Sequence, residues 1–166
     1  TNDLLDEDGV PLIADETVVV EISSITNGIE GSSDDTGVET ETVRIIDNDA
    51  PPTVTFTFLP VSLGEDSGVT SATVTATLST ESGLGVTVNF TKSGSATSAD
   101  YSLVDQIIIT AGQTSGSMTL TVIGDSLDEV DELVTLDIST VINGSELGTQ
   151  TKTVTIVDDD ALPIVT

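Results

Sequence analysis

The sequence predicts an all-β protein whose strands run antiparallel in a β-sandwich. Apolar residues alternate with Thr and Ser at a period of two in many short segments, whereas the 3.6-residue period of helices is rare. Gly, Asn and Asp interrupt these segments at positions typical of turns. Short strands rich in Val, Thr and Ile with turns between them favour two sheets packed face to face.

Seven strands are expected within one repeat of the chain. The segment "VTSATVTATLS" places Val69, Val74 and Leu78 near one face, and a slip of the alternation near Ser71 indicates a β-bulge. A repeat of this length can bury a hydrophobic core without disulfides, and the chain has no cysteine. The expected strands cover residues 53–59, 69–79, 86–92, 103–110, 117–123, 133–141 and 151–157.

An internal similarity predicts that the sandwich is repeated in tandem. "DETVVVEISSITNGIEG" from Asp15 resembles "DELVTLDISTVINGSELG" from Asp131, and Asp49 lies 111 residues before Asp160. Residues 1–50 are therefore interpreted as the C-terminal half of one repeat, 51–160 as a complete repeat and 161–166 as the start of the next. Without the front of its repeat, the first half should pair with a missing upstream segment, another chain or a swapped neighbour.

Composition excludes several functions. The chain carries 29 acids and three bases, a formal net charge of −26, so nucleic acid and anionic membranes are poor partners. It has no His and no Cys, which excludes a Ser-His-Asp triad, a cysteine nucleophile and a zinc site with nitrogen or sulfur ligands. No apolar run reaches transmembrane length, so direct membrane insertion is not expected. We therefore predict that the protein is not an enzyme and that any metal is bound by oxygen atoms.

The acids are expected to gather at one end of the sandwich. In seven consecutive antiparallel strands, the connections after strands one, three and five and the exit from strand seven lie at the same end. Eleven acids fall there, against two (Glu81 and Glu146) in the opposite connections. Carboxylates packed this closely destabilise a fold unless a cation neutralises them, and Ca²⁺ takes six to eight oxygen ligands in flexible geometry. Magnesium is disfavoured because it prefers fewer carboxylates and keeps its waters. We call this end the acidic pole; it contains Glu65, Asp66, Asp100, Asp125, Asp128, Glu129, Asp131, Glu132, Asp158, Asp159 and Asp160.

Four motifs in this order resemble the Calx-β domain family of sodium–calcium exchangers, an integrin tail and bacterial surface proteins: "GSATSADY", "ITAGQTSGSMTLTVIGD", "DEVDELVTLDIS" and "TVTIVDDD". The resemblance spans residues 53–160 as a full module and 15–49 as the end of another. It implies a seven-stranded immunoglobulin-like sandwich that binds calcium. The ligand positions that it implies are Glu65, Asp100, Asp125, Glu129, Glu132, Asp158, Asp159 and Asp160, with the Leu127 carbonyl as a further ligand.

Two departures from the family pattern affect the expected ligands. Gly124 stands where the family has the first of two paired Asp residues, so the complete repeat loses one carboxylate. In the partial repeat the terminal triplet is Asp47-Asn48-Asp49, and extra residues precede Glu16. The corresponding candidate ligands there are Glu16, Asp47 and Asp49.

The leading functional prediction is a calcium-binding structural repeat of a large secreted or cell-surface protein of the bacterial adhesin type. Calcium would stiffen the module and its linker, and the partners would be neighbouring repeats of the same chain and other surface proteins or chains. The extreme acidity and the near-absence of Lys favour an extracellular location. Two alternatives stay open: a passive spacer or protein-recognition repeat without an ion site, and a cytosolic calcium sensor module of an exchanger.

Overall fold

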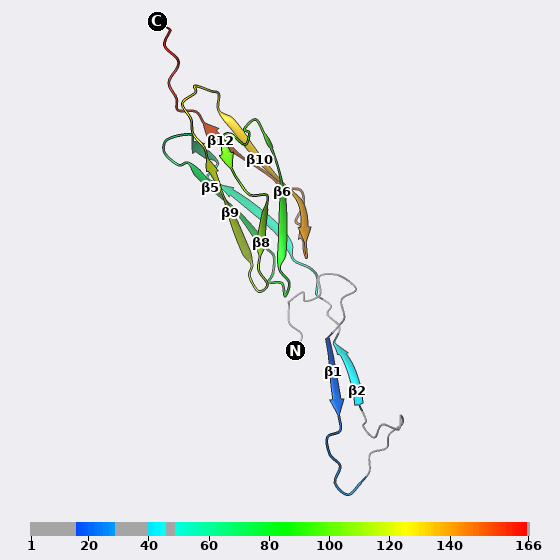
Figure 1. The fold of residues 1–166 in the computed structure, drawn as a ribbon. Coiled ribbons are helices and arrows are strands. Elements are labelled where there is room, and N and C mark those ends of the chain that lie inside the picture. Colours follow the sequence, from blue (N-terminus) through cyan, green and yellow to red (C-terminus); the bar gives the residue numbers. More distant parts are fainter. Residues whose placement is uncertain (1–15, 29–39, 46–48, 166) are drawn as a thin grey trace.

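The computed structural model describes residues 16–28, 40–45 and 49–165, and every regular element in these ranges is a strand (Figure 1). Two of them, β1 (Glu16–Glu21) and β2 (Thr40–Ile45), form a two-stranded antiparallel sheet. The other ten form two five-stranded sheets. Among the described residues, no helix has the length and apolar character needed to cross a membrane.

The two larger sheets each contain long central strands and short strands at an edge. The first has the order β4-β12-β10-β6-β8 and the second β11-β3-β5-β9-β7. The strands of the first sheet are β4 (Ser62–Gly64), β6 (Val86–Gly94), β8 (Gln106–Ile109), β10 (Glu132–Ile142) and β12 (Thr151–Val157). Those of the second are β3 (Thr53–Leu59), β5 (Ser71–Leu78), β7 (Tyr101–Ser102), β9 (Ser115–Val122) and β11 (Ser145–Glu146).

The hydrophobic core lies between these two sheets. Successive side chains of a strand point to opposite faces, so every second residue of β3 and β5 is buried, as is every second residue of β9 from Met118. Phe56 on β3 meets Phe90 on β6 across the sandwich in an edge-to-face contact, with ring centroids 5.1 Å apart. All the buried hydrophobic side chains of the described residues fall between Val54 and Ile156. This core therefore belongs to the sandwich and takes nothing from β1 or β2.

The structure confirms the predicted sandwich and modifies its details. The seven expected strands correspond to β3, β5, β6, β8, β9, β10 and β12, while β4, β7 and β11 were not predicted. A strictly antiparallel arrangement is wrong at two edges, because β4 pairs with β12 and β11 with β3 in parallel. Val69 was expected on the core face but is exposed, because β5 begins only at Ser71. The bulge lies instead in β10, between Ile138 and Thr140.

The strand directions bring four chain segments together at one end, as predicted. β3 and β9 both run antiparallel to β5, and β6 and β12 both run antiparallel to β10. Backbone hydrogen bonds then join these segments, from the Glu65 amide to the Val157 carbonyl (3.0 Å) and from the Ile123 amide to the Asp100 carbonyl (2.8 Å). In Figure 1 this end is at the top, where the red C-terminal segment leaves β12. The acidic pole is therefore a real cluster of connections.

Candidate metal centre

Three carboxylates of the acidic pole converge on one point. Glu65, Asp125 and Asp160 each present one oxygen atom, and these atoms all lie within 4.8 Å of one another. Glu65 follows β4, Asp125 follows β9 and Asp160 follows β12, so the group joins three separate connections. Only Glu65 of the three is buried, with 8% of its surface exposed. The site is thus buried at Glu65 and open to solvent at Asp125.

Glu65 is held in place by the short strand before it. Leu63 is buried in the core, and the amide of Glu65 donates to the carbonyl of Val157 at 3.0 Å. The chain then turns tightly, since the Gly64 amide donates to the Val69 carbonyl at 2.9 Å. A Cβ atom on Gly64 would lie 1.9 Å from the carbonyl oxygen of Ser67, so only glycine fits this close approach. The parallel pairing of β4 with β12 therefore fixes the position of the Glu65 side chain.

Asp125 is oriented by two backbone amides. Its own amide donates to Oε1 of Glu65 at 3.4 Å, and its Oδ1 accepts from the Leu127 amide at 2.7 Å. Beside it, a Cβ atom on Gly124 would lie 1.8 Å from Oδ1 of Asp66. The Asp66 carboxylate therefore occupies the space that a side chain at position 124 would need. Asp66 is a candidate ligand that the sequence analysis placed in the acidic pole but did not select.

The terminal Asp triplet ties the exit of β12 to the neighbouring connections. Asp159 accepts hydrogen bonds from the Asp66 amide (3.2 Å) and from the hydroxyl of Ser67. The Asp158 amide donates to Oδ1 of Asp131 at 3.3 Å. Two oxygens of the triplet, Oδ1 of Asp158 and Oδ2 of Asp160, are buried and have no hydrogen-bond partner. Burying a carboxylate oxygen without a donor is costly when the group is ionised, and a bound cation would remove that cost.

Electrostatics at the group disfavour full ionisation without a cation. Burial raises the pKa of Glu65, and the charges of Asp125, Asp158 and Asp160 raise it further, against the hydrogen bond from the Asp125 amide. Desolvation and the surrounding aspartates also raise the pKa of Asp160. Asp159 behaves differently, because the Ser67 hydroxyl and the Asp66 amide hold its pKa below the usual value. Glu65 and Asp160 therefore have the electrostatic character of metal ligands, and Asp159 that of a structural acceptor.

Asp100 and Glu132 form a second acidic pair at the same end. Asp100 accepts hydrogen bonds from the amide and the hydroxyl of Thr97 at 2.6 and 2.8 Å. The hydrogen bond from the Thr97 amide is the main reason that the pKa of Asp100 is lowered. Burial raises the pKa of Glu132, as do the charges of Asp100 and Glu129. The interaction between the two side chains lowers the pKa of Asp100 and raises that of Glu132. Within residues 16–28, 40–45 and 49–165, however, only the Glu65 group brings three carboxylates to a common point.

The other predicted ligands are Leu127 and three acids of the partial repeat. The Leu127 side chain is exposed and its amide binds Asp125, while the role of its carbonyl stays a prediction. Glu16 is the first residue of β1. Asp49 lies partly buried after β2 and does not belong to the converging group. Asp47 lies outside the described residues. A second site in the partial repeat therefore stays a prediction.

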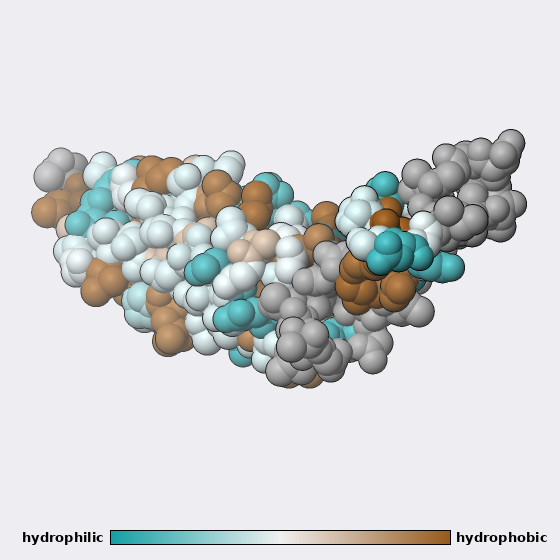
Figure 2. All heavy atoms as spheres, turned by 90° about the horizontal axis from the view of Figure 1, so that it is seen from below, coloured by the Kyte–Doolittle hydropathy of each residue, from teal (hydrophilic) through white to brown (hydrophobic). Residues whose placement is uncertain are grey.

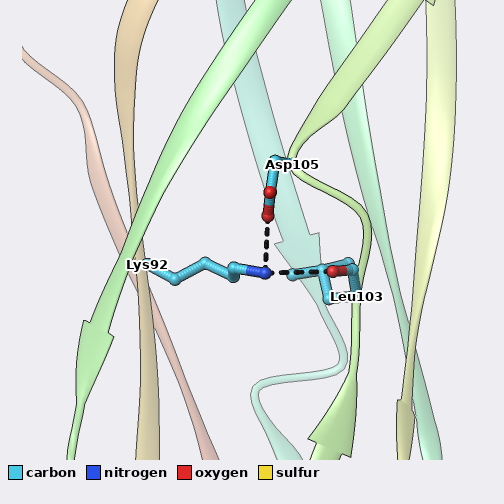
Figure 3. Close-up of polar contacts among 3 residues, drawn as sticks. All are labelled: Lys92, Leu103 and Asp105. Atoms are coloured by element: carbon cyan, nitrogen blue, oxygen red, sulfur yellow. Dashed lines mark hydrogen bonds and ion pairs between the residues drawn. The ribbon is translucent and has the colours of Figure 1, made fainter. Parts of the chain in front are cut away.

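The basic side chains of the sandwich do not neutralise the pole. The Lys92 ammonium lies 2.5 Å from Oδ1 of Asp105 and donates to the Leu103 carbonyl at 3.1 Å (Figure 3). Lys152 is near the start of β12, whereas Asp158 follows the end of that strand. The third base, Arg44, lies in β2. The two lysines of the sandwich therefore lie away from the converging carboxylates.

An all-β sandwich with an oxygen-only, carboxylate-rich end is thus the class that fold and site define. No family model matches the chain, and no curated protein matches it. Among solved structures it is similar to CBD12 from CALX1.2 (TM-score 0.50, 20% identity) and to the calcium binding domain CBD12 of CALX1.1 (TM-score 0.50, 21% identity). The matches cover 63% and 64% of this chain and 45% of each neighbour, so the chain spans less than half of their length. The sandwich has a Calx-β-like fold, and the resemblance predicted from the sequence is confirmed for the fold.

Proposed function

We propose that the acidic pole binds Ca²⁺ through Glu65, Asp125 and Asp160. The observation that carries the proposal is the convergence of these three carboxylates from three connections, with oxygen atoms within 4.8 Å of one another. The unpartnered buried oxygens of Asp158 and Asp160 fit the same interpretation. Asp66 is placed to add a further carboxylate where Gly124 lacks one.

The donor set favours calcium over other metals. All the candidate ligands are oxygen atoms, which suit hard cations, and their number exceeds what Mg²⁺ usually takes from protein side chains. A bound divalent cation supplies the positive charge that offsets repulsion among the carboxylates. One of the similar structures is described as a calcium binding domain, which supports this assignment.

In the protein as a whole, the module would act as a calcium-stiffened repeat of a large secreted or cell-surface protein. The support is local: the terminal triplet runs directly into the segment 161–165, which leads away from the sandwich (Figure 1). An ion held by Asp160 would therefore restrain the first residues of the linker as well as the connections of the domain. Neighbouring repeats of the same chain and other surface proteins are the partners that this role implies.

A cytosolic calcium sensor is the second candidate, and the similarity to calcium binding domains favours it equally. The two roles differ in affinity, since extracellular modules bind calcium with Kd near 10⁻⁴ to 10⁻³ M and sensors near 10⁻⁷ to 10⁻⁵ M. A passive spacer would bind no ion at all. The Kd of the whole chain therefore separates the three roles.

The test is a calorimetric titration of the chain with Ca²⁺ and with Mg²⁺, combined with thermal melts in each ion and in chelator. We expect saturable, calcium-selective binding that raises Tm and is lost in Asp160→Asn. The matched control is Glu81→Gln, which removes one charge at the opposite end and should bind like the parent. Flat heats and identical melts in calcium and chelator would contradict the proposal and favour the spacer.

A further inference from the structure

The β1–β2 pair exposes an apolar face. Val18, Val20, Val43 and Ile45 lie on one side of this small sheet, and each is between 47% and 59% exposed. Figure 1 draws β1 and β2 at the bottom of the view, and Figure 2, which is seen from below, shows apolar side chains gathered to the right of centre. Four large apolar side chains on one face of two neighbouring strands are a surface that normally packs against another layer.

This pair repeats the geometry of β10 and β12 in the sandwich. Glu16 pairs with Ile45 as Glu132 pairs with Ile156, and all six pairs of β1–β2 correspond to the six pairs of β10–β12 in the same register. The turn residue after each first strand also agrees. Asn27 and Asn143 both adopt the left-handed conformation, with φ of 60° and 59°. The two hairpins are therefore equivalent structures as well as similar sequences.

The equivalence identifies the partner that the apolar face requires. Val18, Val20, Val43 and Ile45 correspond to Val134, Leu136, Val154 and Ile156, which are at most 3% exposed. Three of the four residues are identical, and Val20 lacks one methylene group of its counterpart. In the sandwich these four side chains pack into the single core shared with β3, β5 and β9.

We propose that the face formed by Val18, Val20, Val43 and Ile45 is the docking surface for a front half-repeat, a segment with the strand pattern of residues 53–122. The occupant that this proposal names is a segment of the same polypeptide on the N-terminal side of Glu16, because the front half also precedes the hairpin in the complete repeat. The front half within residues 49–165 is not available, since it already covers β10 and β12. The front half of a second copy of the chain is not available either, because it already covers β10 and β12 of that copy.

The test duplicates residues 51–131 directly before Glu16 and leaves residues 16–166 unchanged. The chain has no cysteine, so a single introduced thiol reports burial. Val20→Cys probes the docking face, and the matched control Val19→Cys probes the opposite face of the same strand, with the two parent side chains 59% and 60% exposed. Hydrogen exchange of β1 and β2 in the extended chain without cysteine gives a second readout that needs no substitution.

In the parent chain we expect both thiols to react at similar rates. In the extended chain we expect Val20→Cys to react at least about tenfold more slowly than Val19→Cys, with slowed amide exchange in β1 and β2. Val18→Asp in the extended chain should abolish this protection. Equal rates and unprotected amides in the extended chain would overturn the proposal. So would a parent chain that sediments as a dimer with the Val20→Cys thiol protected, because the occupant would then be a second copy. The experiment is run in calcium and in chelator, since the docking face does not depend on the ion.

Discussion

Replacement of Glu65 by Gln should stabilise the protein in chelator and destabilise it in calcium. Glu65 is buried, and its carboxylate oxygen lies within 4.8 Å of that of Asp125. Two unit charges at this separation repel by about 1 kcal/mol in a water-like medium and by about 3.5 kcal/mol at an effective dielectric constant of 20. Because Asp125 is exposed and screened by solvent, the lower figure applies. Gln keeps the oxygen that accepts from the Asp125 amide, removes the charge and replaces the second carboxylate oxygen with an NH2 group.

In chelator, Glu65→Gln should therefore be more stable than the parent by about 1 kcal/mol, or about 4 °C in Tm. In calcium at a hundredfold excess over Kd, the parent gains about 2.7 kcal/mol from binding. A variant with about hundredfold weaker affinity retains only about 0.4 kcal/mol of that gain. The variant should then be less stable than the parent by about 1 kcal/mol.

The assay is thermal unfolding followed by circular dichroism in chelator and across a calcium titration. Glu81→Gln removes the same charge at the opposite end and should shift Tm equally in both conditions. A Glu65→Gln variant whose effect has the same sign in calcium and in chelator would refute the assignment of Glu65 as a ligand.

Three further outcomes follow from the same structure. Leu136→Ala leaves a cavity in the core and should cost about 2–5 kcal/mol equally in calcium and in chelator, as urea unfolding would show. Gly124→Ala should displace the Asp66 carboxylate, because its Oδ1 lies 1.8 Å from the new Cβ position. Calorimetry should then show weaker calcium binding. An unchanged Kd would exclude Asp66 as a ligand. Burial and nearby carboxylates raise the pKa of Glu65 and Glu132 in the folded state, so above pH 4.5 the folded state binds more protons than the unfolded state. In chelator, the contribution of these two groups to the free energy of unfolding should therefore fall as the pH rises from 4.5 through their raised pKa values. In calcium, the free energy of unfolding should instead rise with pH. Thermal melts from about pH 4 to about pH 7 in chelator and in calcium check both directions.

Much of the sandwich was accessible from the sequence because its central strands alternate regularly. Val74 and Leu78 are buried as the period of two predicts. β4 was not accessible, since three residues are too few to show a period. Its presence depends on its parallel pairing with β12, which lies far away in the sequence, and no local pattern predicts such a contact. The exposure of Val69 has the same origin, because the turn that follows Gly64 delays the start of β5.

The acidic pole could be predicted from strand direction alone, but the arrangement of its members could not. Strand parity places Glu65, Asp125 and Asp160 at one end without stating which carboxylates meet. The contact between Asp66 and the space at Gly124 joins residues 58 positions apart, and it depends on how the two connections pack. Sequence therefore indicated the chemistry of the site, and the packing of the connections selects its ligands.

The location of these ligands determines what a bound ion would change. Hydrogen bonds already join the exit of β12 to its neighbours through Asp158 and Asp159, and the core is complete without any metal. Asp160 is the last acid before the Ala-Leu-Pro segment, and one of its oxygens lacks a partner. An ion bound there adds a restraint at the point where the chain leaves the sandwich. Pro163 fixes its own φ three residues later, so little free chain is left between the bound carboxylate and the next stiff position. The mechanical effect of calcium should accordingly be concentrated at the junction between successive modules, and much less of it should reach the strands of the core.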